Sequence, residues 1–152
     1  MAIPRTIPIA REEGYHTDRI GTFAGGQFMG FVTATLPMPP PDDWPAKKRW
    51  YAVLHTFDTT GQHTRTEAVF AGTTADGERD VVDRAQRKLD GLIEPLDSVH
   101  YGDISVGLFE VEIDGERFGL VDMSDRNDDY ERVDLLPNDL AFFEPWDGSY
   151  DT

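Results

Sequence analysis

The segment from Asp125 to Asp129 comes closest to metal-binding chemistry in this sequence. Asp125, Asn127 and Asp129 stand at alternate positions, as do the first three oxygen ligands of a calcium-binding loop. The rest of that pattern is missing, because Tyr130 occupies the position where glycine permits a sharp turn and Leu136 the position of the closing glutamate. We therefore expect no stoichiometric calcium site, and we predict no metal or other cofactor.

The histidines also form no metal-binding pattern, since no two stand at the spacing that brings ligands together on one helix face. They are His16, His55, His63 and His100. His55 shares one face of a predicted strand with Tyr51 and Val53, and this position favours a hydrogen-bonded histidine in the core or at its edge.

Glu110 and Glu112 project from one side of a predicted strand, and two neighbouring carboxylates can divide the roles of acid and base. The alternate positions Phe109, Val111 and Ile113 are apolar, so a strand with one face in solvent explains both glutamates without catalysis. No serine stands in a Gly-x-Ser-x-Gly motif, and no glycine-rich loop with a nearby lysine could hold a phosphate. We predict no catalytic residues, and these patterns favour a protein that is not an enzyme.

Two hairpins and a central strand are expected in the first half of the chain. Residues 20–23 and 27–36 flank Ala24-Gly25-Gly26, and two glycines between β-rich runs predict a turn with positive φ. Residues 50–57 carry apolar side chains at both odd and even positions, which indicates a strand buried on both faces. Turn residues follow at 58–62, and residues 63–71 are predicted to return as the second strand of a hairpin.

Residues 103–113 and 116–123 form the clearest hairpin signal, because Asp114-Gly115 between them favours the two-residue turn that matches strand twist. A helix from Thr74 to Ile93 is predicted between the hairpins. Its apolar residues follow helical spacing: Val81, Val82, Ala85, Leu89, Leu92 and Ile93. Such a stripe must be covered, so we expect one α+β domain over residues 1–152, with a mostly antiparallel sheet of five to seven strands and this long amphipathic helix packed on one face.

The composition limits the possible partners and compartments. The 29 acidic and 14 basic residues give a formal charge of −15, which repels nucleic acids and anionic membranes. The acids concentrate towards the C-terminal end, where residues 122–152 contain ten acids and two bases. The sequence has no cysteine, no membrane-length apolar run and no signal-peptide pattern at residues 1–10, so we expect a cytoplasmic protein.

Several segments resemble small actinobacterial proteins that carry the label formate hydrogenlyase regulatory protein. The resemblance rests on residues 7–17 (IPIAREEGYHT), 48–58 (KRWYAVLHTFD), 71–78 (AGTTADGE), 101–104 (YGDI) and 146–152 (WDGSYDT). It extends over nearly the whole chain and implies a regulator that acts through protein contacts. The chain has no basic recognition helix of the kind that a directly DNA-binding regulator needs.

We expect an acidic, non-enzymatic protein-interaction module, either a regulator or an immunity-type inhibitor of a basic partner protein. Near the C-terminal end, acidic residues interleaved with aromatic residues could steer and anchor such a partner, or the aromatic residues could simply pin the terminus to the core. The possible anchors are Phe142, Phe143, Trp146 and Tyr150, and the steering carboxylates are Glu144, Asp147 and Asp151. The candidate partner-binding residues are Asp125, Asp128, Asp129, Glu131, Trp146, Asp147 and Tyr150. The alternatives are a small-molecule enzyme or ligand-binding protein with an unrecognised pocket, and a carboxylate-rich mimic of DNA.

Overall fold

The computed structural model describes residues 3–124 and 130–152, and it shows an α+β fold of antiparallel sheets with one long helix. The largest sheet has the order β5-β4-β3-β2-β6, formed by β2 (Arg19–Phe23), β3 (Gly26–Thr35), β4 (Arg49–Phe57), β5 (His63–Thr73) and β6 (His100–Tyr101). The second sheet has the order β11-β10-β9-β8, formed by β8 (Phe109–Ile113), β9 (Glu116–Asp122), β10 (Arg132–Leu136) and β11 (Leu140–Phe143). A short pair joins β1 (Ile7–Ile9) to β7 (Ile104–Val106).

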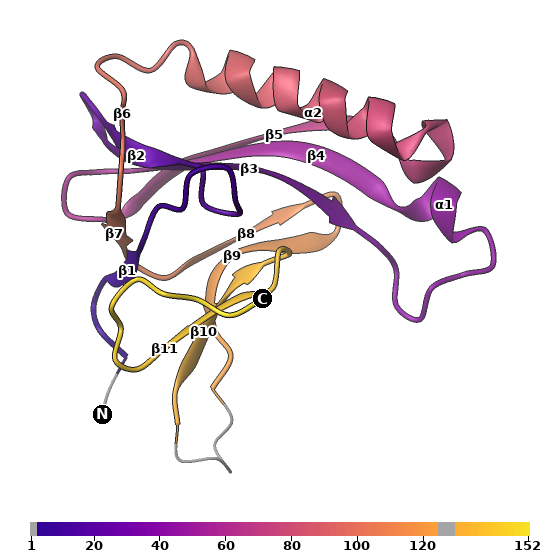
Figure 1. Ribbon diagram of the computed structural model, residues 1–152. Coiled ribbons are helices and arrows are strands. Elements are labelled where there is room, and N and C mark those ends of the chain that lie inside the picture. The colour runs from indigo at the N-terminus through magenta and orange to yellow at the C-terminus, as the bar shows by residue number, and fades with distance from the viewer. Residues whose placement is uncertain (1–2, 125–129) are drawn as a thin grey trace.

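These elements are stacked in layers (Figure 1). The helix α2 (Glu78–Ile93) covers one face of the five-stranded sheet, and the four-stranded sheet lies on the other side. Two short helical segments, α1 (Trp44–Lys47) and the 3₁₀ turn η1 (Thr74–Asp76), lie in the connections on either side of β4 and β5. None of the helices in the described residues is both long and apolar enough to cross a lipid bilayer.

The predicted apolar stripe of α2 does face the sheet. Val81, Ala85, Leu89 and Ile93 are buried, and they pack on residues of β3, β4 and β5. The helix is shorter at its beginning than the predicted range, because Gly77 has a φ of 99° and this backbone conformation interrupts the helical path. The residues before Gly77 form the 3₁₀ turn instead, closed by a hydrogen bond of 3.0 Å from the Thr73 backbone N–H to the Asp76 carboxylate.

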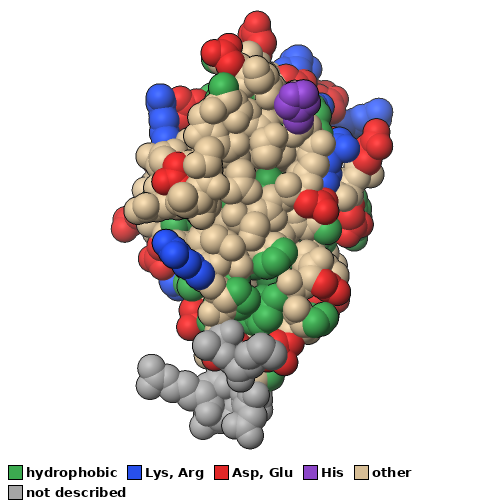
Figure 2. Space-filling view, turned by 90° about the vertical axis from the view of Figure 1, so that its left-hand side faces the viewer, with side chains coloured by type: hydrophobic (Ala, Val, Ile, Leu, Met, Phe, Trp, Pro, Cys, Tyr) green, Lys and Arg blue, Asp and Glu red, His purple; other side chains and the backbone are tan. Residues whose placement is uncertain are grey.

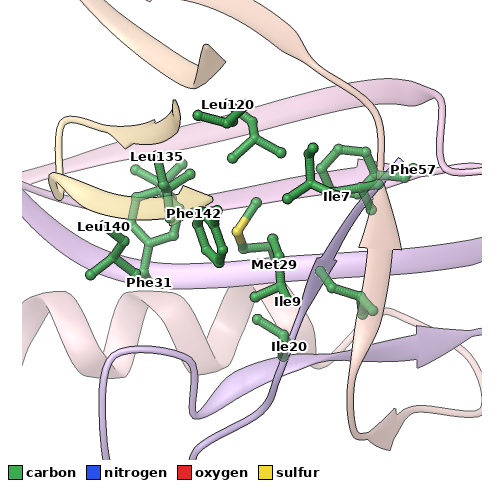
Figure 3. Close-up of a cluster of buried hydrophobic side chains, with 14 of the residues drawn as sticks. Ile7, Ile9, Ile20, Met29, Phe31, Phe57, Leu120, Leu135, Leu140 and Phe142 are labelled. Atoms are coloured by element: carbon green, nitrogen blue, oxygen red, sulfur yellow. The ribbon is translucent and has the colours of Figure 1, made fainter. Parts of the chain in front are cut away.

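The larger core lies between the two main sheets (Figure 3). Its side chains come from β1, β2, β3, β4 and β7 as well as from the four-stranded sheet, and they include Ile7, Ile9, Ile20, Met29, Phe31, Phe57, Leu120, Leu135, Leu140 and Phe142. Strand β4 therefore has one face against this core and the other against α2, as its two apolar faces predict. The four-stranded sheet was not anticipated as a separate layer.

The predicted hairpins are present, with one difference in the second half of the chain. Asp114 and Gly115 both have positive φ, at 52° and 81°, as the two central residues of a type I′ turn require. The predicted strand 103–113 is divided, because its first part pairs with β1 and its second part with β9. The division falls at Gly107, whose backbone N–H donates to the Gly61 carbonyl at 2.8 Å in the β4–β5 turn.

Candidate functional site

The C-terminal loop, defined as residues 144–151, is closed and fixed to the body of the protein. Ala141 and Asp151 form a pair of backbone hydrogen bonds of 2.8 and 2.9 Å, so the loop begins beside β11 and returns to it. The Ala10 backbone N–H also donates to the Gly148 carbonyl at 3.0 Å, which attaches the middle of the loop to the N-terminal segment. A short hydrophobic strand, β11, is thus followed by a loop with a defined backbone.

The aromatic residues near this loop divide into two groups. Phe142 is buried, and Trp146 and Tyr150 are partly buried and pack against the larger core. Phe143 is on the other side of β11 and has 36 % of its surface exposed. Three of the four aromatic side chains therefore hold the terminus to the core, and Phe143 is the one that a partner could contact.

Three carboxylates of the C-terminal loop belong to exposed residues: Glu144, Asp147 and Asp151. The Asp147 carboxylate accepts hydrogen bonds from the Ser149 hydroxyl at 2.6 Å and from the Ser149 backbone N–H at 3.1 Å. These bonds, the side-chain one foremost, lower the pKa of Asp147, so it is a fixed negative charge at neutral pH. The loop presents its charges from an ordered turn.

The structure places the seven predicted partner-binding residues in different settings. Asp125, Asp128 and Asp129 lie outside the described residues. Glu131 is partly buried immediately before β10, and Trp146 and Tyr150 are partly buried against the core. Asp147 is the exposed one of the four that are described, and the predicted anchor Phe143 and the predicted steering carboxylates of Glu144 and Asp151 are exposed as well. Their exposure depends on the path of β11 and the loop, which no local pattern specifies.

One acidic residue of this region does not belong to its surface. Asp134 is buried on β10, and its carboxylate lies 2.9 and 3.0 Å from two guanidinium nitrogens of Arg132. Burial raises the pKa of Asp134, and the Arg132 charge opposes that rise. The carboxylate is committed to this ion pair and adds nothing to a partner-facing charge.

The fold brings together His55 and His63, two histidines whose separation in the sequence is not that of metal ligands on one helix face. His55 Nδ1 and His63 Nε2 each lie 2.7 Å from the Thr66 hydroxyl oxygen, and the His63 ring is stacked on Phe109 at a centroid distance of 4.4 Å. His55 itself has 0 % exposure and packs between Phe31 and Phe109. It is a core histidine with a hydrogen-bond partner, as its strand position predicts.

The two histidines differ in access, because His55 is enclosed whereas the partly exposed His63 borders an open hollow beside the β4–β5 turn. Burial, with a smaller effect of His63, lowers the pKa of His55 to about 3, and burial also lowers the pKa of His63, so both rings are neutral at physiological pH. Within residues 3–124 and 130–152, no three histidine or carboxylate side chains gather in a way that could hold a metal ion. The Thr66 hydroxyl of β5 is in hydrogen-bond contact with the His55 ring of β4 and with the His63 ring of β5. The arrangement is therefore a structural link between β4 and β5.

The edge of the five-stranded sheet is the other exposed feature. Strand β5 is outermost, and each residue from His63 to Phe70 is at least partly exposed, whereas Tyr51 to His55 of the neighbouring β4 are all buried. Extra residues interrupt the β4–β5 register at Thr64 and at Ala71. Regular pairing thus runs from Arg65 to Phe70, and the outer side of this segment is a sheet edge.

The geometry defines a layered α+β protein whose candidate contact surfaces are an acidic C-terminal loop and the edge of a sheet. No family model matches the chain, and no match was found for it among curated proteins or among solved structures.

Proposed function

We propose that this protein is an acidic, non-enzymatic interaction module of the cytoplasm that binds a basic partner protein, as a regulator or an immunity-type inhibitor. The observation that carries the proposal is the exposed Phe143 followed by the exposed carboxylates of Glu144, Asp147 and Asp151 on a loop with fixed backbone. The regulatory form of the proposal follows from the resemblance described above, and the lack of cysteine is compatible with a reducing compartment.

The loop has the physical properties of a protein-recognition surface. Its carboxylates attract a positively charged partner over several ångströms and raise the association rate, while the exposed Phe143, immediately before the loop, supplies apolar contact area. The backbone bonds at Asp151 and Gly148 order the loop before binding, so little conformational entropy is lost when a partner arrives. The formal charge of −15 adds a long-range attraction for the same class of partner.

A small-molecule enzyme is less well supported. The side chain with the most perturbed pKa, His55, lies inside the core and not on the wall of an open hollow. The faces of the five-stranded sheet on either side of it are filled by α2 and by the four-stranded sheet. Substrate access to His55 would require these layers to separate.

A mimic of DNA is also less well supported, because such a protein needs rows of carboxylates at phosphate-like spacing. The outer side of α2 alternates in sign, since Arg79, Arg87 and Lys88 interrupt its acidic residues. Figure 2 likewise shows basic side chains among the acidic ones around the rim of one face, with hydrophobic side chains gathered next to the atoms drawn in grey. Charges of mixed sign break up a phosphate-like row.

The proposal is tested by affinity capture from the native host with the purified chain as bait, followed by binding measurements on the captured protein at rising salt. The variant Glu144→Lys/Asp151→Lys reverses two loop charges, and we expect it to slow association roughly tenfold at low salt. Phe143→Ser should mainly raise the dissociation rate, because it removes apolar contact area and no charge.

The matched control is Asp83→Lys/Glu94→Lys, which changes the net charge equally on exposed residues of α2 and the residue after it. A loop-specific interface predicts a small effect of this control. Equal weakening by both double variants would show that only the net charge of the protein matters for binding. A partner whose binding depends neither on salt nor on the substitutions at Phe143, Glu144 and Asp151 would contradict the proposal.

A further inference from the structure

The six residues from Arg65 to Phe70 form an open strand edge of ordinary length. They pair in unbroken register with Thr56 to Tyr51 of β4, and among the described residues no other strand pairs with β5. A sheet edge of this kind presents a row of backbone N–H and C=O groups on which an additional strand can form.

The regular register of this edge segment is interrupted at both ends. At one end, the extra residue Ala71 turns its carbonyl to the Arg84 guanidinium, which donates to it at 2.8 Å. At the other end, the extra residue Thr64 uses its hydroxyl to contact β4, with a hydrogen bond of 3.1 Å to the Thr56 carbonyl. An added strand is therefore limited to about six residues.

The side chains of the edge segment differ between its two faces. Arg65 and Glu67 lie on the side of α2, where they border a hollow with Leu54 and Leu92, and they form an ion pair with each other. The other face carries Ala68, which packs on the larger core, and Phe70, which is exposed and has the Arg49 guanidinium 4.1 Å from its ring centroid. One face is thus charged and the other is mainly apolar.

A second copy of this chain is a poor match for the edge. If two copies paired through this edge about a two-fold axis, the two β5 strands would be antiparallel, and one residue of the segment would pair with the same residue of the other copy. The registers that keep most of the segment paired have Glu67 or Ala68 as this central residue. The first register places Glu67 opposite its own copy, and the second places it opposite Val69. Both bring together two chains that each carry a formal charge of −15.

We infer that the edge from Arg65 to Phe70 of β5 receives an extended segment of a basic partner protein as an additional antiparallel strand. The segment has a lysine or arginine opposite Glu67, on the α2 side, and apolar residues opposite Ala68 and Phe70 on the other face. The inference rests on the proposed function for the positive charge of the partner, and it adds a contact surface separate from the C-terminal loop.

The probe is a blocked synthetic peptide with the sequence lysine, leucine, threonine, valine, lysine, valine, threonine, lysine, which places its central lysine opposite Glu67. The charge reversal Glu67→Lys should weaken binding by calorimetry or fluorescence anisotropy roughly tenfold, because it exchanges cross-strand attraction for repulsion. The matched control Glu112→Lys changes the same charge on an exposed residue of β8 and should stay within about twofold of the unsubstituted chain. Hydrogen exchange should show new protection at the amides of residues 65–70.

Three outcomes would overturn the inference: equal weakening by Glu67→Lys and Glu112→Lys, undiminished binding of a peptide N-methylated along its pairing edge, or no binding of the unmodified peptide. A loss of peptide binding in Glu144→Lys, with none in Glu67→Lys, would also overturn it and would leave the C-terminal loop as the binding surface. Conversely, a response to Glu67→Lys alone supports the strand edge even if the loop variants do not affect the captured partner.

Discussion

The Tyr51 hydroxyl donates a hydrogen bond of 2.8 Å to the Asp114 carboxylate and so connects the two main sheets. Tyr51 belongs to the buried strand β4, and Asp114 is in the turn between β8 and β9. The Arg49 side chain completes the contact, since its Nε donates to the same hydroxyl at 2.9 Å. Burial raises the pKa of Tyr51, so the hydroxyl keeps its proton and remains a donor at neutral pH.

We expect Tyr51→Phe to reduce the free energy of unfolding by about 1 to 2 kcal/mol, because it leaves the partly exposed Asp114 and Arg49 without their shared hydroxyl. Urea unfolding of Tyr51→Phe, Asp114→Asn and the double variant measures the coupling between the two positions. Strictly additive effects would show that the hydrogen bond does not hold the sheets together.

Acid should destabilise the fold before the carboxylates begin to titrate. Folded His55 has a pKa of about 3, against an ordinary value of 6.5, and the pKa of His63 is also lowered. Below about pH 6.5 the unfolded chain binds protons that folded His55 rejects, so stability is fully present above that pH and falls as the pH decreases towards 3. The expected slope is about 1.4 kcal/mol per pH unit for each histidine that remains neutral.

The measurement is a series of urea unfolding curves between pH 7.5 and 4.5, compared with the variant His55→Asn/His63→Asn. Asparagine can still form a hydrogen bond with Thr66 but does not titrate, so the variant should be less stable at pH 7.5 and much less sensitive to pH. Parallel curves for the two proteins would assign the pH dependence to other groups.

Leu89→Ala should cost about 2 to 5 kcal/mol of stability, because Leu89 is buried between α2 and the sheet and its loss leaves a cavity. Gln86→Ala, on an exposed turn of the same helix, should change stability by less than about 0.5 kcal/mol. Thermal or chemical unfolding checks both values, and similar small effects would mean that the stripe of α2 is not a core face.

Gly30→Ala tests how closely α2 approaches the sheet. A Cβ atom at this position would lie 2.9 Å from Leu89 Cδ1 and 3.4 Å from Ile93 Cδ1, so the helix side chains must move. We expect a loss of about 1 kcal/mol. Gly102→Ala is the control, because nothing lies within 4 Å of its added Cβ, and it should be close to neutral in the same unfolding assay.

The local patterns predicted much of the secondary structure for identifiable reasons. The period of the apolar residues from Val81 to Ile93 located α2 and its buried face, and Asp114-Gly115 located a hairpin through the positive φ that both residues adopt. The start of α2 was misplaced because the hydroxyl and carboxylate of Thr73 and Asp76 cap a 3₁₀ turn as well as they cap an α-helix.

What the sequence alone determined about this protein is the α+β class, the buried central strand, the amphipathic helix and the strong negative charge. These properties depend on residue type and on spacing over a few turns or strand repeats. The tertiary structure decided which strands are edges, that His55 and His63 share Thr66, and that Phe143 is exposed while Phe142 is buried. Such relationships join residues through strand order and layer packing, and a one-dimensional pattern contains no record of which face or edge its neighbours will cover.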